Sequence, residues 1–147
     1  MRKKLIAGNW KMNGSLSFNE DWVKGIKGEL SSLGSTSQVE VMVCVPSPYL
    51  SQMGLLLKGS PVVLGAQDVS AQAKGAFTGE VSLGMLKDFG VHGAIIGHSE
   101  RRAYHGESDA VVAQKVKSCV GSSIMPIVCF GETQEQRQAG QTNQVIQ

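Results

Sequence analysis

Three polar stretches carry side chains that could bind and transform a small anionic substrate. They are residues 9–13, 67–80 and 98–102. Each follows a short apolar run, and in α/β folds ligands meet the protein at the carboxyl ends of buried parallel strands. The amide of Asn9, the ammonium group of Lys11 and the imidazole of His98 could together hold an anion, polarise a carbonyl group and stabilise an enolate-like oxyanion.

Each stretch also has an interpretation without chemistry. Taken singly, Asn9 is typical of a turn, Lys11 of a solvated surface and His98 of a hydrogen-bonded strand end. Residues 98–102 could form a charged surface loop with a helix-capping serine. Residues 67–80 could be a disordered excursion, because their polar bias is that of disordered segments, although loops of this length in compact domains tend to be functional. The joint placement of the three residues favours a site.

Five apolar runs predict the strands that position these loops. We expect strands near residues 4–9, 39–45, 61–66, 91–96 and 124–129. The first and fourth runs contain uncharged cores, Leu5 to Gly8 and Gly93 to Ile96, which are typical of strands buried on both faces of a sheet. The regular alternation with helical patterns predicts parallel pairing with right-handed crossovers. Five such units make either a small doubly wound sheet or part of an eight-stranded barrel, which needs ~250 residues when complete.

Helical patterns lie between these runs. The spacing of Ser17 and Glu20 is that of a capping box. The apolar face of the helix that follows comprises Phe18, Trp22, Ile26, Leu30 and Leu33. We expect further helix N-caps at Ser47, with Pro48 at the first helical position, and at Ser82 and Ser108. A polar, Gln-rich helix is expected after Thr133.

Composition limits the class of protein. The 147 residues are enough for one compact domain, and a content of 41% hydrophobic and 18% charged residues is typical of a globular protein. A net charge of +2 without a basic cluster argues against nucleic acid as a partner, and no apolar run approaches the ~20 residues of a membrane span. The first apolar run is too short for a signal peptide, so we expect a cytoplasmic protein with no membrane partner and with reduced thiols at Cys44, Cys119 and Cys129.

Six motifs resemble, in order and with similar spacing, those of the triosephosphate isomerase family. They are Ala7-Gly8-Asn9-Trp10-Lys11-Met12-Asn13, Gly65-Ala66-Gln67-Asp68, Gly75-Ala76-Phe77-Thr78-Gly79-Glu80-Val81-Ser82, Gly97-His98-Ser99-Glu100-Arg101-Arg102, Tyr104-His105-Gly106-Glu107-Ser108 and Cys129-Phe130-Gly131-Glu132-Thr133. The resemblance implies an α/β fold, a parallel (β/α)8 TIM barrel of which about five β/α units are present. Residues 1–147 would form a single domain with strands one to five and the start of the next helix.

The resemblance also implies an activity, the interconversion of dihydroxyacetone phosphate and D-glyceraldehyde 3-phosphate through an enediolate, in glycolysis and gluconeogenesis. No cofactor or metal would be needed. Lys11 would neutralise the substrate phosphate and the developing oxyanion, and Asn9 would hydrogen-bond the substrate. His98 would polarise the carbonyl group as a neutral imidazole and shuttle protons.

Further residues receive supporting roles from the same resemblance. Ser99, Glu100 and Cys129 would support the site, with Glu100 near Lys11. The loop around Thr78 would insert into the second subunit of a homodimer.

The family's carboxylate base, its mobile lid and most of its phosphate-binding backbone amides lie beyond the fifth strand. This chain contains no Glu-Pro-x-Trp segment that could carry the base. We therefore expect an amino-terminal portion of the enzyme that is inactive by itself. One alternative is a non-catalytic half-barrel that binds phosphorylated ligands or a partner chain. Another is a different phosphate-binding barrel enzyme, against which the joint presence of Asn9, Lys11 and His98 argues.

Overall fold

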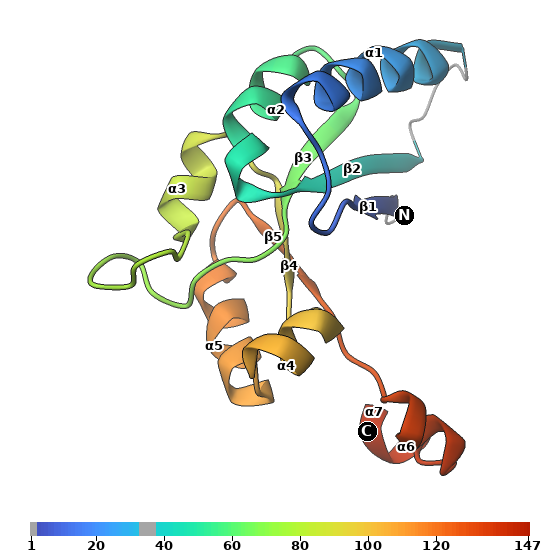
Figure 1. The fold of residues 1–147 in the computed structure, drawn as a ribbon, viewed down its shortest axis with the longest axis vertical. Coiled ribbons are helices and arrows are strands. Elements are labelled where there is room, and N and C mark those ends of the chain that lie inside the picture. Colours follow the sequence, from blue (N-terminus) through green and yellow to red (C-terminus); the bar gives the residue numbers. More distant parts are fainter. Residues whose placement is uncertain (1–2, 33–37) are drawn as a thin grey trace.

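The computed structural model describes residues 3–32 and 38–147, in which five strands form one parallel sheet (Figure 1). The strands are β1 (Lys4–Asn9), β2 (Val39–Val45), β3 (Val62–Ala66), β4 (Gly93–Ile96) and β5 (Met125–Val128). Their order in the sheet is β1-β2-β3-β4-β5, and every neighbouring pair is parallel. A doubly wound sheet reverses its strand order at a switch point, and this sheet does not. The predicted strands are confirmed, and their order is that of a barrel section.

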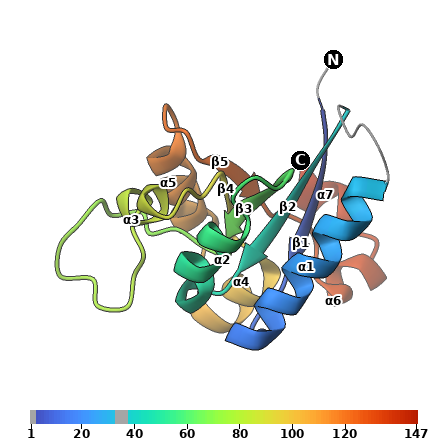
Figure 2. The ribbon, with the colours of Figure 1, turned by 90° about the horizontal axis from the view of Figure 1, so that it is seen from above.

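Helices follow the strands and pack along the sheet. They are α1 (Leu16–Ser32), the 3₁₀ turn η1 (Ser47–Tyr49) with α2 (Leu50–Leu56), α3 (Leu83–Asp88), α4 (Ser99–His105), α5 (Asp109–Cys119), α6 (Gln134–Gln138) and α7 (Thr142–Ile146). Figure 2 shows the sheet curving, with α1, α2, α3 and α5 along one side of it. Among the described residues, no helix combines the length and apolar character that crossing a membrane requires.

The main hydrophobic core lies between the sheet and these helices. It joins outward side chains of the strands to one face of each helix, among them Val23, Val43, Val45, Leu50, Met53, Leu64, Leu86, Ile96, Val112 and Cys119. Side chains alternate between the faces of a strand, so the opposite face carries a second, smaller cluster. That cluster contains Met42, Cys44 and Ile95, with Val63, Ile127 and Cys129 partly buried against it. The second cluster occupies the concave side, which in a barrel is the interior.

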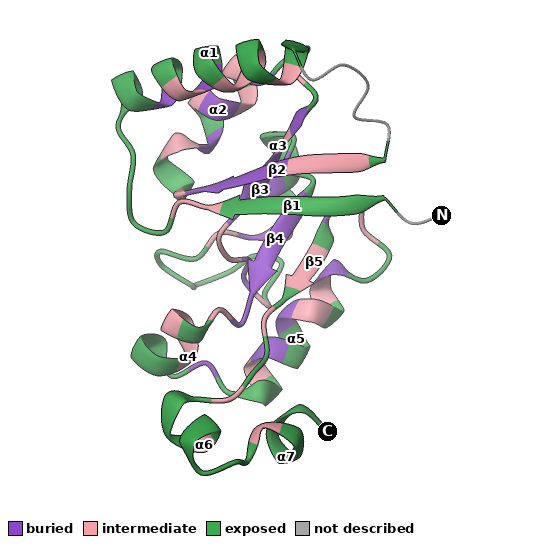
Figure 3. Ribbon diagram, turned by 90° about the vertical axis from the view of Figure 1, so that its right-hand side faces the viewer, coloured by how far each residue is buried: buried purple, intermediate pink, exposed green. Residues whose placement is uncertain are grey.

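The burial of the first strand differs from the sequence prediction. β1 is exposed along most of its length, with Leu5 at 37% and Ile6 at 60% exposure, whereas β4 is buried throughout (Figure 3). The reason is position, because β1 is an edge strand that pairs with β2, while β4 lies between β3 and β5. An apolar run predicted the strand correctly but not its environment.

Two predicted helix caps are wrong, and two are confirmed. The Ser15 hydroxyl accepts a hydrogen bond from Phe18 N–H, so the cap of α1 lies two residues before the expected Ser17. Ser47 lies inside η1, whose N-cap is Pro46. The Ser82 and Ser108 hydroxyls accept from Met85 N–H and Val111 N–H at the starts of α3 and α5, as expected. Leu33, predicted for the apolar face of α1, lies outside the described residues.

Candidate active site

One pocket at the carboxyl ends of the strands brings the three principal predicted residues together. Its lining consists of Asn9, Lys11, Met12, Gln67, Asp68, His98, Glu100, Arg101 and His105. Asn9 ends β1, Gln67 directly follows β3, and His98 follows β4 by two residues. Residues far apart in sequence meet here because the parallel strands all end at the same edge of the sheet.

Lys11 has an unusual backbone conformation. Its φ angle is 53°, the one positive value at a non-glycine residue within the described part of the chain. Such a conformation costs of order 1–3 kcal/mol and persists only where the surroundings enforce it. The Asn9 side-chain oxygen accepts from Lys11 N–H at 2.9 Å, and the Lys11 carbonyl accepts from the Gln67 side-chain amide at 2.7 Å. Both backbone polar groups of Lys11 are therefore held by side chains.

The Lys11 ammonium group is oriented by a carboxylate. Its Nζ lies 2.7 Å from Glu100 Oε1, and this hydrogen bond, together with the charge of Lys11, holds the pKa of Glu100 below its usual value. Both side chains are about half exposed, so the pair adds little to stability. Its consequence is geometric, because an ionised Glu100 directs the ammonium group into the pocket that contains His98.

His98 serves as the N-cap of α4. Its Nδ1 accepts from Glu100 N–H at 3.2 Å, and its carbonyl accepts from the N–H groups of Arg101 and Arg102. A ring nitrogen that accepts carries no proton, so the neutral imidazole bears its hydrogen on Nε2. The arrangement supplies an Nε2–H donor at the pocket. The alternative considered from sequence was a helix-capping serine in this loop, whereas the cap is His98, a residue type that seldom caps helices.

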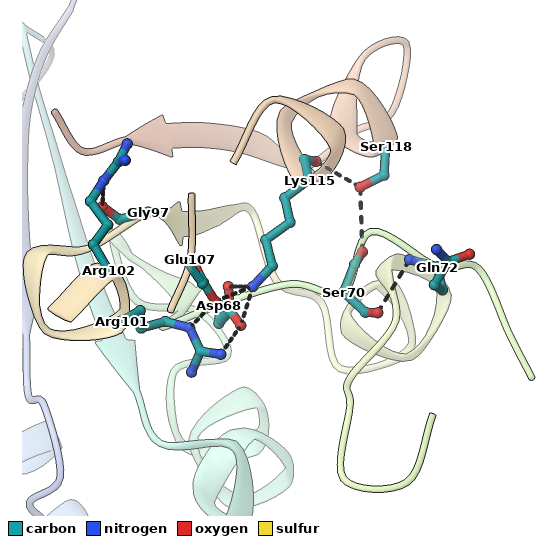
Figure 4. Close-up of polar contacts among 9 residues, drawn as sticks. All are labelled: Asp68, Ser70, Gln72, Gly97, Arg101, Arg102, Glu107, Lys115 and Ser118. Atoms are coloured by element: carbon teal, nitrogen blue, oxygen red, sulfur yellow. Dashed lines mark hydrogen bonds and ion pairs between the residues drawn. The ribbon is translucent and has the colours of Figure 1, made fainter. Parts of the chain in front are cut away.

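Figure 4 shows a cluster of four charged side chains, two of which, Asp68 and Arg101, also line the pocket. Lys115 Nζ lies 2.7 Å from both Asp68 carboxylate oxygens and 2.6 Å from Glu107 Oε1, while Arg101 contacts Asp68 at 3.0 Å and Glu107 at 2.5 Å. The side chains of Lys115 and Glu107 are each only 5% exposed. The cluster ties the loop after β3 to α4 and α5, and it fixes Arg101 at the rim of the pocket.

The two carboxylates of this cluster have opposite pKa shifts. Burial raises the pKa of Asp68 despite its contacts with Lys115 and Arg101. For Glu107, burial also acts upward, but the hydrogen bonds from Lys115 and Arg101 outweigh it and lower the pKa. Glu107 is the more deeply buried of the two carboxylates and accepts from both cations through one oxygen, so its ionised form is the better stabilised.

Arg102 links the ends of β4 and β5. Its Nε donates to the Gly97 carbonyl at 2.8 Å and its Nη2 to the Cys129 carbonyl at 3.1 Å, and its Nη1 pairs with Asp109 at 2.6 Å. The last ladder bond between these strands runs from Cys129 N–H to the Ile96 carbonyl. The guanidinium group thus continues the connection past the ladder and holds the peptide that precedes His98.

The predicted supporting residues are divided between two pockets. Glu100 shares the first pocket with Lys11. Ser99 and Cys129 line a neighbouring pocket between the loops after β4 and β5, and His98 contributes to both. Burial raises the pKa of the Cys129 thiol, so it is uncharged at neutral pH. Thr78 lines neither pocket; it is exposed in the long loop between β3 and α3, which projects from the body of the molecule (Figures 1 and 2).

Sequence reasoning missed the residues that hold the site residues in place. Gln67 and Asp68 were quoted only as part of a motif, and Arg101, Arg102 and Lys115 received no role. Their position directly after strand ends or on the following helices was the available signal. Within residues 3–32 and 38–147, no three histidine, cysteine, aspartate or glutamate side chains are grouped so that they could hold a metal ion.

The fold and the pocket define a section of a parallel β/α barrel with its ligand site at the carboxyl ends of the strands. Residues 4–147 match the family model described as triosephosphate isomerase. The chain therefore belongs to the triosephosphate isomerase family.

Curated relatives and a solved structure agree with this family. The chain is 54% identical to the triosephosphate isomerase of Albidiferax ferrireducens and 53% identical to that of Cupriavidus pinatubonensis, over 99% of its own length. The crystal structure of triosephosphate isomerase from Bartonella henselae superposes with a TM-score of 0.89 at 36% identity, over 98% of this chain. The chain spans 57–58% of the length of these three proteins.

Proposed function

We propose that this chain supplies the lysine and histidine half of a triose-phosphate isomerase site, which interconverts dihydroxyacetone phosphate and D-glyceraldehyde 3-phosphate. The observation that carries the proposal is the pocket in which Asn9, Lys11 and His98 converge, with Lys11 held in a strained backbone conformation. Strained residues cluster at functional sites, where the surrounding structure enforces them. A surface lysine without a function would have no need of this conformation.

Each residue has a role that follows from its contacts. The Lys11 ammonium group meets the substrate phosphate and the oxyanion of the enediolate. The Asn9 side-chain oxygen is occupied by the Lys11 backbone, so its amide nitrogen donates to the substrate. The Nε2–H of His98 donates to the carbonyl group as negative charge develops on oxygen, which is when a preorganised donor is most effective.

The reaction also requires a base that removes a carbon-bound proton. Glu100 lines the pocket, but its carboxylate is engaged by the Lys11 ammonium group and its lowered pKa makes it a weak base. We therefore assign the base to a carboxylate contributed from outside these 147 residues, as the family resemblance implies. Ser99, Glu100 and Cys129 then support the site rather than perform the proton abstraction.

The proposal extends to partners and location. The exposed loop that contains Thr78 would contact a second subunit of a homodimer. A glycolytic role places the enzyme in the cytoplasm, and no cofactor or metal is required. The second candidate function, a half-barrel that binds phosphorylated ligands without turnover, uses the same pocket and differs only in lacking a base.

A hybrid enzyme separates these two functions. Residues 1–147 are joined to the segment of the Albidiferax ferrireducens relative that begins where the match ends, and the product is assayed with D-glyceraldehyde 3-phosphate after expression in a host without its own isomerase. Turnover that is lost with Lys11→Ala but kept with the control Lys24→Ala, at an exposed position on α1, supports the proposal. A folded hybrid that binds phosphate and shows no turnover would favour the binding function.

A further inference from the structure

Gln67 makes two contacts with backbone carbonyls of segments that are distant from it in sequence. It directly follows β3, and its side-chain nitrogen donates to the Lys11 carbonyl at 2.7 Å and to the Cys44 carbonyl at 3.2 Å. The Cys44 carbonyl also accepts from Trp10 N–H at 3.1 Å. One primary amide therefore joins the end of β2 to the loop that follows β1.

The contact with Gln67 is one of two side-chain hydrogen bonds to the backbone of Lys11. The other bond to the Lys11 backbone comes from Asn9, two residues away. Because Asn9 belongs to the same turn, its bond would move together with Lys11 if the loop relaxed. Gln67 is 56 residues away in sequence and is anchored to the sheet, so it is the restraint that fixes the turn relative to the rest of the site.

We propose that Gln67 is a positioning residue, whose amide holds the Lys11 backbone in its left-handed conformation and thereby places the Lys11 ammonium group in the candidate site. A change of φ to an ordinary negative value turns the Cα–Cβ bond, and with it the ammonium group, away from Glu100. A primary amide suits this position because one nitrogen carries two hydrogens, one for each carbonyl. A glutamate carboxylate has the same shape, but its oxygens only accept hydrogen bonds when ionised, as do the two carbonyl oxygens that they would face.

Nuclear magnetic resonance on the hybrid enzyme, with lysine selectively labelled, tests the backbone claim without any assay of activity. A positive φ brings the amide and α hydrogens of a residue close together, so Lys11 should give a strong intraresidue Overhauser cross-peak. We expect Gln67→Met and Gln67→Glu to weaken this cross-peak several-fold. The control is Gln72→Met in the same loop, at an exposed residue away from the pocket, and it should leave the cross-peak unchanged.

Two outcomes would overturn the inference at this stage. One is an unchanged Lys11 cross-peak in a folded Gln67→Met chain. The other is loss of the fold in both Gln67 variants but not in Gln72→Met, judged by circular dichroism, because Gln67 would then support the sheet rather than Lys11.

A kinetic measurement on the hybrid tests the consequence, and this step rests on the proposed function. We expect Gln67→Met to raise KM about tenfold with a smaller fall in kcat, because a misplaced ammonium group binds the phosphate less well in the ground and transition states alike. In a Lys11→Ala background the same substitution should have no further effect, since coupled residues are not additive. Additive effects would overturn the inference, whereas an inactive hybrid counts against the proposed function and leaves the Lys11 cross-peak to decide the role of Gln67.

Discussion

Lys11 and His98 enter the proposed reaction at different stages, and their variants should differ accordingly. The Lys11 charge faces a phosphate dianion in the ground state and the transition state, so Lys11→Ala should raise KM and lower kcat together, with kcat/KM down ~10³-fold. The carbonyl group is most polarised as the enediolate forms, so His98→Gln should lower kcat ~10²-fold or more with little change in KM. Steady-state kinetics of the hybrid check both, and parallel changes in the two variants would contradict the division of roles.

Glu107 carries a prediction about pH. Its pKa in the folded chain is lowered from an ordinary value of 4.5 by Lys115 and Arg101 in spite of burial. A carboxylate whose pKa is lowered on folding contributes its full stabilisation at pH values above its pKa in the unfolded chain. That contribution is lost as the pH falls through its pKa in the folded chain. Glu107→Gln should therefore cost about 3 kcal/mol in the free energy of unfolding at neutral pH, and the difference from the wild-type chain should shrink below pH 4.5.

Urea unfolding of both chains between neutral and acidic pH measures this difference. Glu29→Gln, at an exposed position on α1, is the matched control and should stay within about 0.5 kcal/mol of the wild-type chain at every pH. A Glu107→Gln penalty that grows on acidification would show that the sign is wrong. The Glu107 charge is one cause of the raised pKa of Asp68, so Glu107→Gln also lowers the Asp68 pKa, and the measured difference reports both carboxylates.

At the scale of elements, the junction between β4 and α4 depends on the absence of a side chain at Gly97. Its φ is 70°, and a Cβ atom there would lie 2.7 Å from Val112 Cγ2 on α5 and 3.2 Å from Arg102 Nη2. Gly106, at the other end of α4, has a φ of 66° and no neighbour within 4 Å of such an atom. The two glycines share the conformational requirement, but only Gly97 adds a packing requirement.

This difference makes a matched pair of substitutions informative. Gly106→Ala should cost about 1–2 kcal/mol, the strain of a left-handed residue with a side chain. Gly97→Ala should cost about 1–3 kcal/mol more, because the overpacked contact forces α5 or Arg102 to move. It should also perturb the imidazole resonances of His98, which Gly106→Ala should leave in place. Equal losses of unfolding free energy for the two variants, measured by urea unfolding, would mean that Val112 moves aside from the new methyl group without a measurable cost.

Most of the elements could be predicted from sequence because their signals are local. The apolar runs identified all five strands. The serine caps of α3 and α5 could be recognised because each serine directly precedes its helix. The errors arose where position in the sheet or a competing residue decided the outcome. β1 is exposed because it is an edge strand, and Ser15 caps α1 in place of Ser17.

The candidate site was predictable only in part. Asn9, Lys11 and His98 could be chosen because each lies at the end of an apolar run, and parallel strands bring those ends to one edge. The roles of Gln67 and Arg102 could not be predicted from sequence, because these roles consist of hydrogen bonds to the carbonyls of Lys11, Gly97 and Cys129. A side chain that hydrogen-bonds to distant backbone leaves no pattern in the sequence. The positive φ of Lys11 has no sequence pattern either.

At the scale of the whole molecule, the sheet of this structure has two open edges, β1 and β5. Ile6 on β1 is 60% exposed and Val128 on β5 is 42% exposed. Unpaired strand edges with apolar side chains favour association, so we expect the isolated 147-residue chain to form oligomers at micromolar concentration. Ile6→Lys should reduce the oligomer fraction in sedimentation velocity, whereas Met12→Lys, in the loop after β1, should not. A monodisperse wild-type chain would contradict this expectation.

The same chain, assayed alone, should not isomerise triose phosphates. Lys11 and His98 stabilise an enediolate only after a base has removed the carbon-bound proton, and the carboxylate in their pocket, Glu100, is held by the Lys11 ammonium group. A positioned base contributes ~10²–10⁴ in rate, and exclusion of water by a closing loop adds to it.

The chain, purified from a host that lacks its own isomerase, is assayed alone and again after refolding with the carboxyl-terminal segment of the Albidiferax ferrireducens relative. We expect turnover only in the second assay, and it should disappear with His98→Gln. Turnover by the chain alone at the rate of the assembled protein would mean that Glu100 or another carboxylate within these residues serves as the base.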